Sequence, residues 1–519
     1  MLSRIAIDHH QVAAGVVIVK DDGIDQLTLL LHDPSTGLWG PPKGLMEPGE
    51  DRISCAIREV REETGISLSI ENILVGEEYV ISYCIDGHTL KTVYLYSSIN
   101  LPKTIACKLS TEHNDFRWVR IDQLSEYVAH DNLRYVLHEI IKKNAVHKKM
   151  QKIKNRLRHQ ILETLPKIIS NRSQDTVDWY IAGSFAANEE SWNLNEGLTS
   201  DIDLVAYSES GVRANTLRRI LGAVSNELKT ILGITEHLNL SVYLVTPASR
   251  LNSTIPFWSY YRNFALPINN AQIDNVIRKF VAEPSDYSYN CFRLLWYCYL
   301  DKFINGASHL QGYNFTKFIV LGAVITWIKD GGKFEGYRML RASLLSHYQN
   351  KIYSNEGHTK DNEVIRWMIL ALERKIFGDF GSTDHSSCNN DIFVDMLRHL
   401  EHGLINYSNI DSKVLSCFLI KLMRGSNAGN ITGYEEVAAF LRDNNHPILN
   451  IIDLPKDQHS IITALALYRL LRWPNEVRCS IWRYEMLAEH LNDVVRHTSE
   501  PSELLQEYNR IVGELAVSY

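Results

Sequence analysis

Residues 39–66 constrain the fold of this 519-residue chain more than any other segment. They read WGPPKGLMEPGEDRISCAIREVREETGI, in which a Pro-Gly turn precedes a run of helix-forming residues that ends at Gly65. Within the run, Glu59, Glu62 and Glu63 stand at positions i, i+3 and i+4. A helix of 3.6 residues per turn places side chains with this spacing on one face. The segment therefore predicts a helix that presents three carboxylates together and ends at the glycine.

Three neighbouring carboxylates repel one another unless a divalent cation lies among them. Mg²⁺ binds carboxylate oxygens, keeps several of its waters and also binds the phosphate oxygens of a substrate. Such a cation neutralises charge on a diphosphate and generates or orients the attacking water. The predicted cofactor is therefore Mg²⁺ or Mn²⁺. The alternative is an acidic surface helix with ordinary charge pairs, but Gly44, Pro48, Gly49 and Gly65 in register count against it.

The same segment resembles the Nudix hydrolases. Their pattern is G, five residues, E, seven residues, then R-E-U-x-E-E-x-G-U, where U is bulky and apolar. It is filled without departure by Gly44, Glu50, Arg58, Glu59, Val60, Glu62, Glu63, Gly65 and Ile66. The resemblance implies an α/β/α sandwich over residues 1–140. It also implies a pyrophosphohydrolase that cleaves a diphosphate linkage in a nucleotide or another nucleoside-diphosphate-linked small molecule.

Three further stretches are similar to the hydrolases of diadenosine tetraphosphate and diphosphoinositol polyphosphates. They are the run from Trp39 to Glu50, the strand-like residues 91–96, and the sequence EHNDFRW at 112–118. By this resemblance, Glu112 is the distal carboxylate that completes the metal or base site, although a solvated loop residue is the alternative. Lys43, beside Gly44, would offer a backbone carbonyl to the metal and its ammonium group to phosphate.

A second motif lies in residues 179–207, WYIAGSFAANEESWNLNEGLTSDIDLVAY. A strand, a Gly183-Ser184 turn and then Asp201 and Asp203 on a following strand resemble the polymerase-beta-like nucleotidyltransferases. The resemblance implies that the turn binds a triphosphate at a helix start. Residues two apart on a strand point to the same face, so both aspartates could share two Mg²⁺ ions. The implied reaction transfers NMP from an NTP to an unknown acceptor.

Two features depart from that pattern. The loop between Ser184 and Asp201 is longer than the family usually has. The third carboxylate is expected on the strand predicted at Leu238–Val245, where the alignment places Ser241. Glu236 is the nearest acid, at the start of that strand. Two hypotheses therefore stay open: an active transferase, or a degenerate transferase domain that senses or binds nucleotide.

Residues 141–165 form a basic segment with no acid between Glu139 and Glu163. Such a helix could contact nucleic-acid phosphates, which supports a third hypothesis, a regulatory or nucleic-acid-interacting protein. Few aromatic residues accompany the cations, so no platform for base stacking is evident. A solvated linker helix is the commoner explanation.

The predicted fold class is a multidomain α+β protein. It has a Nudix α/β/α sandwich, then a nucleotidyltransferase-like α/β domain, then an all-helical C-terminal region. The predicted ranges are 1–140 for the Nudix domain, 141–165 for the connector, 166–255 for the transferase-like domain, and 256–380 and 381–519 for two helical regions.

The composition is that of an ordinary globular protein, with 45% hydrophobic residues and a net charge of −7. This charge argues against a surface that binds nucleic acid throughout. None of the eight cysteines forms a C-x-x-C pair, and the polar N-terminus does not resemble a signal peptide. The most apolar run, Phe318–Ile328, is too short to cross a bilayer and predicts a buried helix. We therefore expect a cytoplasmic protein.

Overall fold

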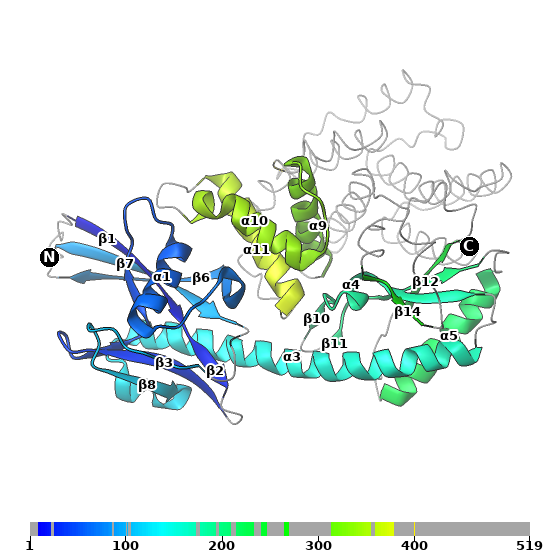
Figure 1. Cartoon of the computed structure of the whole chain (residues 1–519), viewed down its shortest axis with the longest axis horizontal. Coiled ribbons are helices and arrows are strands. Elements are labelled where there is room, and N and C mark those ends of the chain that lie inside the picture. The colour runs from blue at the N-terminus through cyan, green and yellow to red at the C-terminus, as the bar shows by residue number, and fades with distance from the viewer. Residues whose placement is uncertain are drawn as a thin grey trace, which may run out of the picture. The chain divides into compact units, whose positions relative to one another are not determined.

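A computed structural model of the chain describes residues 9–21, 25–85, 88–99, 101, 105–172, 177–193, 197–208, 214–232, 240–245, 264–268, 313–353, 359–377 and 399. The chain separates into two compact units. The first comprises Met1–Asn155 and Arg338–Asp379, and the second comprises Arg156–Tyr337 and Phe380–Tyr519. Figure 1 shows both.

Two sheets form the framework of the first unit. In one, the strand order is β5-β1-β7-β6, with β1 and β7 parallel and the other pairs antiparallel. In the other, β3 pairs antiparallel with β2, β4 and β8. The strands are β1 (His9–Val17), β2 (Val19–Asp21), β3 (Gln26–Asp33), β4 (Leu38–Gly40), β5 (Lys43–Leu45), β6 (Ile73–Ile85), β7 (Thr89–Ser98) and β8 (Asp115–Arg120).

The helix α1 (Arg52–Thr64) follows the Pro48–Gly49 turn and packs on β1. Its first turn is capped by Asp51, whose side chain accepts hydrogen bonds from the N–H groups of Ile53 and Ser54. Gly65 ends it in the left-handed conformation, with φ at 69°. The predicted helix and its predicted end are thus confirmed.

The long helix α3 (Asp131–Arg172) contains the whole predicted connector, 141–165. Its N-terminal part closes the core of the first unit. Leu137 and Ile140 pack there with Val17, Leu30 and Leu95, all of them fully buried. The shorter helices before it are α2 (Leu124–Tyr127) and the 3-10 helices η1 (Ile70–Asn72) and η2 (Ile121–Gln123).

Two helices from far along the chain complete the first unit. They are α10 (Tyr337–Ile352) and α11 (Lys360–Phe377), and α11 packs on β6 (Figure 1, yellow-green). The predicted helical region 256–380 therefore does not coincide with one compact unit, because its last two helices belong to the first unit. The reason is that these helices bury their side chains against the Nudix-like sheet.

The second unit contains a sheet of order β13-β12-β9-β14. The strands β12 and β13 are parallel, and the other pairs are antiparallel. The elements are β9 (Asp178–Ala182), α4 (Gly183–Ala186), β10 (Trp192–Asn193), β11 (Gly197–Leu198), β12 (Ile202–Tyr207), α5 (Ala214–Leu232), β13 (Leu240–Val245), β14 (Leu266–Pro267) and α9 (Tyr313–Lys329). The strand β14 lies beyond residue 255, where the transferase-like domain was predicted to end.

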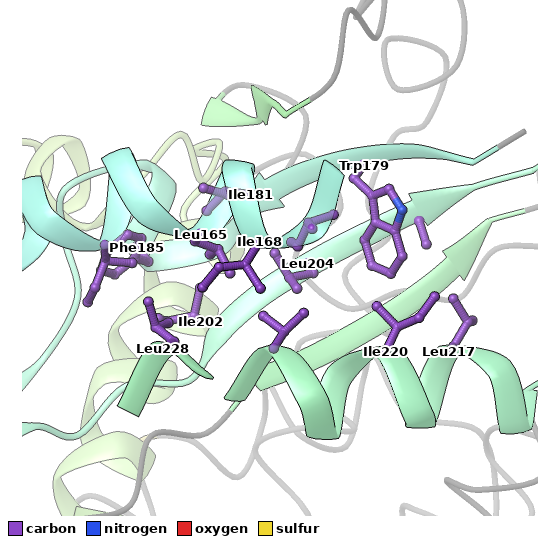
Figure 2. Packing of buried hydrophobic residues seen from close by; sticks show 14 of the residues in the cluster. Leu165, Ile168, Trp179, Ile181, Phe185, Ile202, Leu204, Leu217, Ile220 and Leu228 are labelled. Atoms are coloured by element: carbon purple, nitrogen blue, oxygen red, sulfur yellow. The ribbon is translucent and has the colours of Figure 1, made fainter. Parts of the chain in front are cut away.

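Figure 2 shows the core of this unit. Side chains of α5, such as Leu217 and Leu228, pack with Trp179 of β9, Leu204 of β12 and Leu165 of α3. The amphipathic α5 therefore covers one face of the predicted strands. Glu236 and all of 381–519 except His399 lie outside the described residues. In the part of the chain that the structure describes, no helix is long and apolar enough to cross a membrane.

Candidate functional site

The carboxylate of Glu59 lies against the backbone of β5. A Cβ atom on Gly44 would stand 2.1 Å from the Glu59 carboxyl carbon and 2.1 and 2.2 Å from its two oxygens. Only glycine leaves room there, because any side chain would occupy the volume of the carboxylate. The glycine of the motif therefore lets α1 bring its acidic face close to the strand.

Glu63 is the most buried of the three glutamates, with its side chain 9% exposed. One carboxylate oxygen accepts the backbone N–H of Lys43 at 2.9 Å, and the other lies 3.0 Å from Nε2 of His113. Contact with the Glu63 carboxylate raises the pKa of His113 above its ordinary value, although burial lowers it. His113 was not predicted as a site residue; its place next to Glu112 in the EHNDFRW run was the available signal.

Arg58 lies at the centre of the acidic face. Its guanidinium donates to both oxygens of Glu50 at 2.9 and 2.8 Å, to Glu59 at 2.6 Å and to Glu62 at 3.1 Å. Glu62 is half-exposed and reaches the array only through this arginine. The arginine of the motif thus compensates the charge of the carboxylates and holds them in one place.

Two lysines contribute positive charge to this site. Burial lowers the pKa of Lys91, the charge of Lys43 lowers it further, and the charges of Glu59 and Glu63 oppose the shift. Lys91 on β7 therefore shares an electrostatic environment with Lys43 on β5 and with the carboxylates. It is a second candidate residue that was not singled out from the sequence.

Glu112 is exposed in the turn before β8. Its backbone N–H donates to Ser110 Oγ at 3.3 Å, and its neighbour His113, rather than Glu112 itself, contacts the acidic face. The structure thus brings Lys43, Gly44, Glu59 and Glu63 together. The role of Glu112 as a distal carboxylate stays a prediction.

The donor set fits a hard divalent cation. Burial raises the pKa of Glu59, and the negative charges of Glu63 and Glu62 raise it further, against the effect of Arg58. A cation among these oxygens would relieve that repulsion. Among the residues described, no three acidic, histidine or cysteine side chains are already gathered around one point.

Comparison with known proteins decides the family. Residues 9–140 match the family described as NUDIX domain. A bis(5'-nucleosyl)-tetraphosphatase from Rattus norvegicus is 30% identical over 134 residues, which cover 24% of this chain and 90% of that protein. The chain belongs to the Nudix family. It contains a Nudix hydrolase domain in its first unit, and the predicted box is the acidic face of α1.

Two further proteins are similar to this chain over about a quarter of its length. An RNA pyrophosphohydrolase from Erythrobacter litoralis is 22% identical over 130 residues, covering 22% of this chain and 79% of that protein. The crystal structure of a Caenorhabditis elegans Ap4A hydrolase is 27% identical, covers 24% of this chain and 92% of its own, and gives a TM-score of 0.22. The family assignment rests on the sequence relatives and extends over residues 9–140.

The transferase-like residues lie on or directly beside two neighbouring strands of one sheet in the second unit. Gly183 begins the four-residue α4 directly after β9, with φ at 65°, a conformation that glycine adopts without strain. Asp201 directly precedes β12, and Asp203 is its second residue. In the strand register, Asp203 is paired with Ala182 on one side and with Ser241 on the other. Ser241 therefore occupies the backbone position beside Asp203 that the sequence alignment assumed.

The long loop between Ser184 and Asp201 has a structural explanation. It contains Glu189 and Glu190, both buried, and the β10–β11 hairpin. The carboxylate of Glu190 lies 3.2 Å from Arg158 of α3, and that of Glu189 accepts the backbone N–H of Tyr337 at 2.9 Å. The extra residues thus serve contacts within the second unit.

Proposed function

We propose that the Nudix domain hydrolyses a diphosphate linkage in a dinucleoside polyphosphate or a similar nucleotide-type small molecule, with Mg²⁺ or Mn²⁺ as cofactor. One observation carries the proposal. The Glu63 carboxylate is held between the Lys43 N–H and His113, next to a Glu59 carboxylate seated on Gly44. Two carboxylates are thereby fixed next to each other, and the charges of Lys43 and Lys91 act in the same environment, as binding of a metal and a polyphosphate requires.

Each residue has a distinct role in this proposal. Glu59, Glu62 and Glu63 hold the cation, and Glu112 joins them as the distal carboxylate. When bound, the cation neutralises phosphate charge and supplies an activated water. Lys43 and Lys91 bind and orient the polyphosphate, and His113 keeps the Glu63 carboxylate in place. Arg58 restrains the carboxylates that the cation does not use.

A small-molecule substrate is favoured over RNA by the pairing of the basic residues on α3. Lys143 lies 3.2 Å from Glu77, Lys152 lies 3.4 Å from Asp21, and Lys154 is buried. These cations are partly used inside the first unit, and the chain as a whole carries a net charge of −7. A tract that recognises a nucleic-acid backbone needs its cations free for phosphates.

The test is hydrolysis by the full-length chain, with product analysis. Diadenosine tetraphosphate and a 5'-triphosphorylated RNA would be compared in Mg²⁺ and in EDTA. Glu63→Gln should lose nearly all activity while keeping its melting temperature, and the exposed Glu126→Gln is the matched control. A Glu63→Gln protein with normal turnover contradicts the metal assignment. Cleavage of the RNA alone contradicts the small-molecule substrate.

We also propose that the second unit binds an NTP at Gly183, Ser184, Asp201 and Asp203 and transfers NMP from it. The support is the common sheet: the glycine turn follows β9, both aspartates lie at the start of β12, and the strands are hydrogen-bonded neighbours. Two carboxylates and triphosphate oxygens can together bind Mg²⁺. The alternative is a degenerate domain that binds a nucleotide but transfers nothing. It is motivated by Ser241, at the sequence position where the transferase pattern has a carboxylate that activates the acceptor hydroxyl.

An active transferase and a nucleotide-binding module can be distinguished by incubating the chain with Mg²⁺ and labelled ATP, CTP, GTP or UTP and separating the products. Transfer that Asp201→Ala abolishes, while dinucleotide hydrolysis continues, supports two independent sites. Transfer that appears only in Ser241→Asp identifies the natural site as a binding module. A mobility shift with RNA that weakens steeply as salt rises would support the regulatory, nucleic-acid-binding alternative instead.

A further inference from the structure

The N-terminus of α1 meets the C-terminal end of α10, although the two lie about 300 residues apart in the sequence. The backbone N–H of Arg52, the first residue of α1, donates to the carbonyl of Tyr353 at 3.2 Å. Its guanidinium donates to the carbonyl of Ile352 at 3.2 Å. The N–H groups that begin one helix and the carbonyls that end another lack partners within their own helices. Here they partly satisfy each other, and the two helix dipoles attract.

Gln349 in the last turn of α10 holds the cap of α1. Its side-chain amide nitrogen lies 3.1 Å from both oxygens of Asp51 and 3.1 Å from Ser54 Oγ. The same Asp51 carboxylate accepts from the N–H of Ile53 at 2.9 Å and from that of Ser54 at 3.1 Å. The cap that begins the metal-binding helix is therefore itself oriented by a residue of α10.

Arg52 forms a second connection between the start of α1 and the α10–α11 pair. Its side chain is 1% exposed, lies 3.4 Å from the carboxylate of Glu78 on β6, and stacks over the ring of Tyr94 with 4.3 Å to the ring centroid. Glu78 also accepts from Arg366 of α11 at 2.9 Å. A buried charge is stable only when it is paired. The start of α1 is thus fixed by a buried ionic group to which α11 contributes.

The α10–α11 pair is anchored to β6 where the strand pairing is interrupted. The register of β6 on β7 shifts between Leu74 and Tyr79. Within this bulge, the carboxylate of Glu373 accepts the N–H groups of Val75 at 3.0 Å and Gly76 at 2.9 Å. The hydroxyl of Tyr353 donates to the carbonyl of Val75 at 2.9 Å. The helices therefore supply hydrogen-bond partners that the neighbouring strand does not.

Two further features show that the α10–α11 pair packs directly on this bulge. A Cβ atom on Gly76 would lie 2.6 Å from the Cα of Leu370 and 2.8 Å from a carboxylate oxygen of Glu373. Arg341 of α10 is buried, donates to Glu373 at 2.7 Å and to the carbonyl of Ile73 at 2.7 Å. The contact is polar, buried and specific, so it defines one position of the helix pair on the sheet.

We propose that α10 and α11 are the positioning element of the Nudix site, with Gln349 as the positioning residue that acts through Asp51 on the start of α1. This inference rests on the proposed Nudix function of Glu59 and Glu63. The sheet holds the helix pair through Glu373 and Arg341, and the pair holds the helix that carries the metal ligands. Displacement of catalytic groups by about 1 Å can reduce a rate on the order of 100-fold. The helix pair acts on the site through the contact of Gln349 with Asp51.

The test compares three variants in the full-length chain with diadenosine tetraphosphate as the substrate. Gln349→Ala removes the hydrogen bonds to Asp51. Gln349→Glu keeps the shape but places a second carboxylate beside Asp51. Asn362→Ala is the matched control, because this amide donates to the carbonyl of Lys351 at 3.0 Å inside the helix pair.

We expect kcat to fall about tenfold in Gln349→Ala and further in Gln349→Glu, with KM within about twofold of the wild type. Asn362→Ala should keep kcat. If Gln349→Glu retains full kcat, or if both alanine variants lose kcat equally with the same fall in melting temperature, Gln349 only packs and the proposal is overturned.

Amide hydrogen exchange of α1 separates this proposal from the proposed function. Gln349→Ala should speed exchange in the first turn of α1, and Asn362→Ala should not. Failure of the wild-type chain to hydrolyse the substrate contradicts the proposed function, and the exchange measurement then decides the positioning role by itself. Unchanged exchange in Gln349→Ala overturns that role.

Discussion

Gly44→Ala tests the packing of the Glu59 carboxylate, a proposed metal ligand, in a way that leaves the fold intact. The added Cβ would lie 2.1 Å from the carboxyl carbon of Glu59, whereas ordinary contact begins at 3.4 Å. The carboxylate must therefore move by about 1 Å. At the end of a flexible side chain such a movement costs little folding free energy, but a misplacement of this size costs on the order of 100-fold in rate. That corresponds to about 2.7 kcal/mol of transition-state stabilisation.

The stability of this variant should stay level or rise slightly. Gly44 is not among the glycines with positive φ, so its backbone accommodates alanine, which restricts the unfolded chain by about 0.4–1 kcal/mol. This gain offsets the cost of moving the Glu59 carboxylate, which accepts from Arg58 at 2.6 Å. Gly49→Ala is the matched control. Its φ is 80° and nothing lies within 4 Å of an added Cβ. It should destabilise the domain by about 1 kcal/mol and leave kcat/KM unchanged.

The assay combines steady-state hydrolysis of diadenosine tetraphosphate with urea unfolding of each variant. A double variant, Gly44→Ala with Glu59→Asp, should be no slower than Glu59→Asp alone, because the shorter side chain already vacates the contested volume. A Gly44→Ala protein that keeps kcat/KM within about twofold of the wild type, beside an inactive Glu63→Gln, would refute the reasoning.

Two other predictions concern groups outside the acidic face. Burial raises the pKa of Glu77, but Lys143 and Arg374 outweigh this and hold it below its ordinary value. The ionised Glu77 carboxylate therefore contributes to the free energy of unfolding. This contribution is fully present above the unfolded pKa of about 4.3, and it is lost as pH falls through the lower folded pKa. Lys143→Ala should therefore cost about 1–2 kcal/mol in urea unfolding at pH 7 and less at pH 3; an equal cost at both would contradict the pairing. Burial raises the pKa of the Cys55 thiol to about 12, so iodoacetamide at pH 8 should alkylate the exposed Cys84 and spare Cys55 until the protein unfolds. Mass spectrometry of the native protein reads this out, and equal labelling of both would show that α1 opens readily.

Much of the Nudix site could be predicted because its signals are local. The spacing of Glu59, Glu62 and Glu63 and the glycine at position 65 act within a few turns of one helix, where periodicity and capping decide the structure. The strands at 179–182 and 202–207 were predicted for a similar reason, since short apolar runs bounded by turns are typical of buried strands. The strand register pairs Ser241 with Asp203, and its place in a transferase site stays a prediction.

The acidic helix, its two ends and the family of the chain could all be inferred from local sequence patterns. The contacts made by distant groups emerged only from the folded chain. His113, in the turn before β8, contacts Glu63, Lys91 comes from β7, and Gln349, from a helix almost 300 residues downstream, contacts the cap of α1. The tertiary structure also assigned intramolecular partners to Lys143 and Lys152, which in the sequence read as part of a free basic segment. The physical reason is that such contacts depend on sheet register and on buried polar groups finding partners. Neither leaves a periodic signal along the chain.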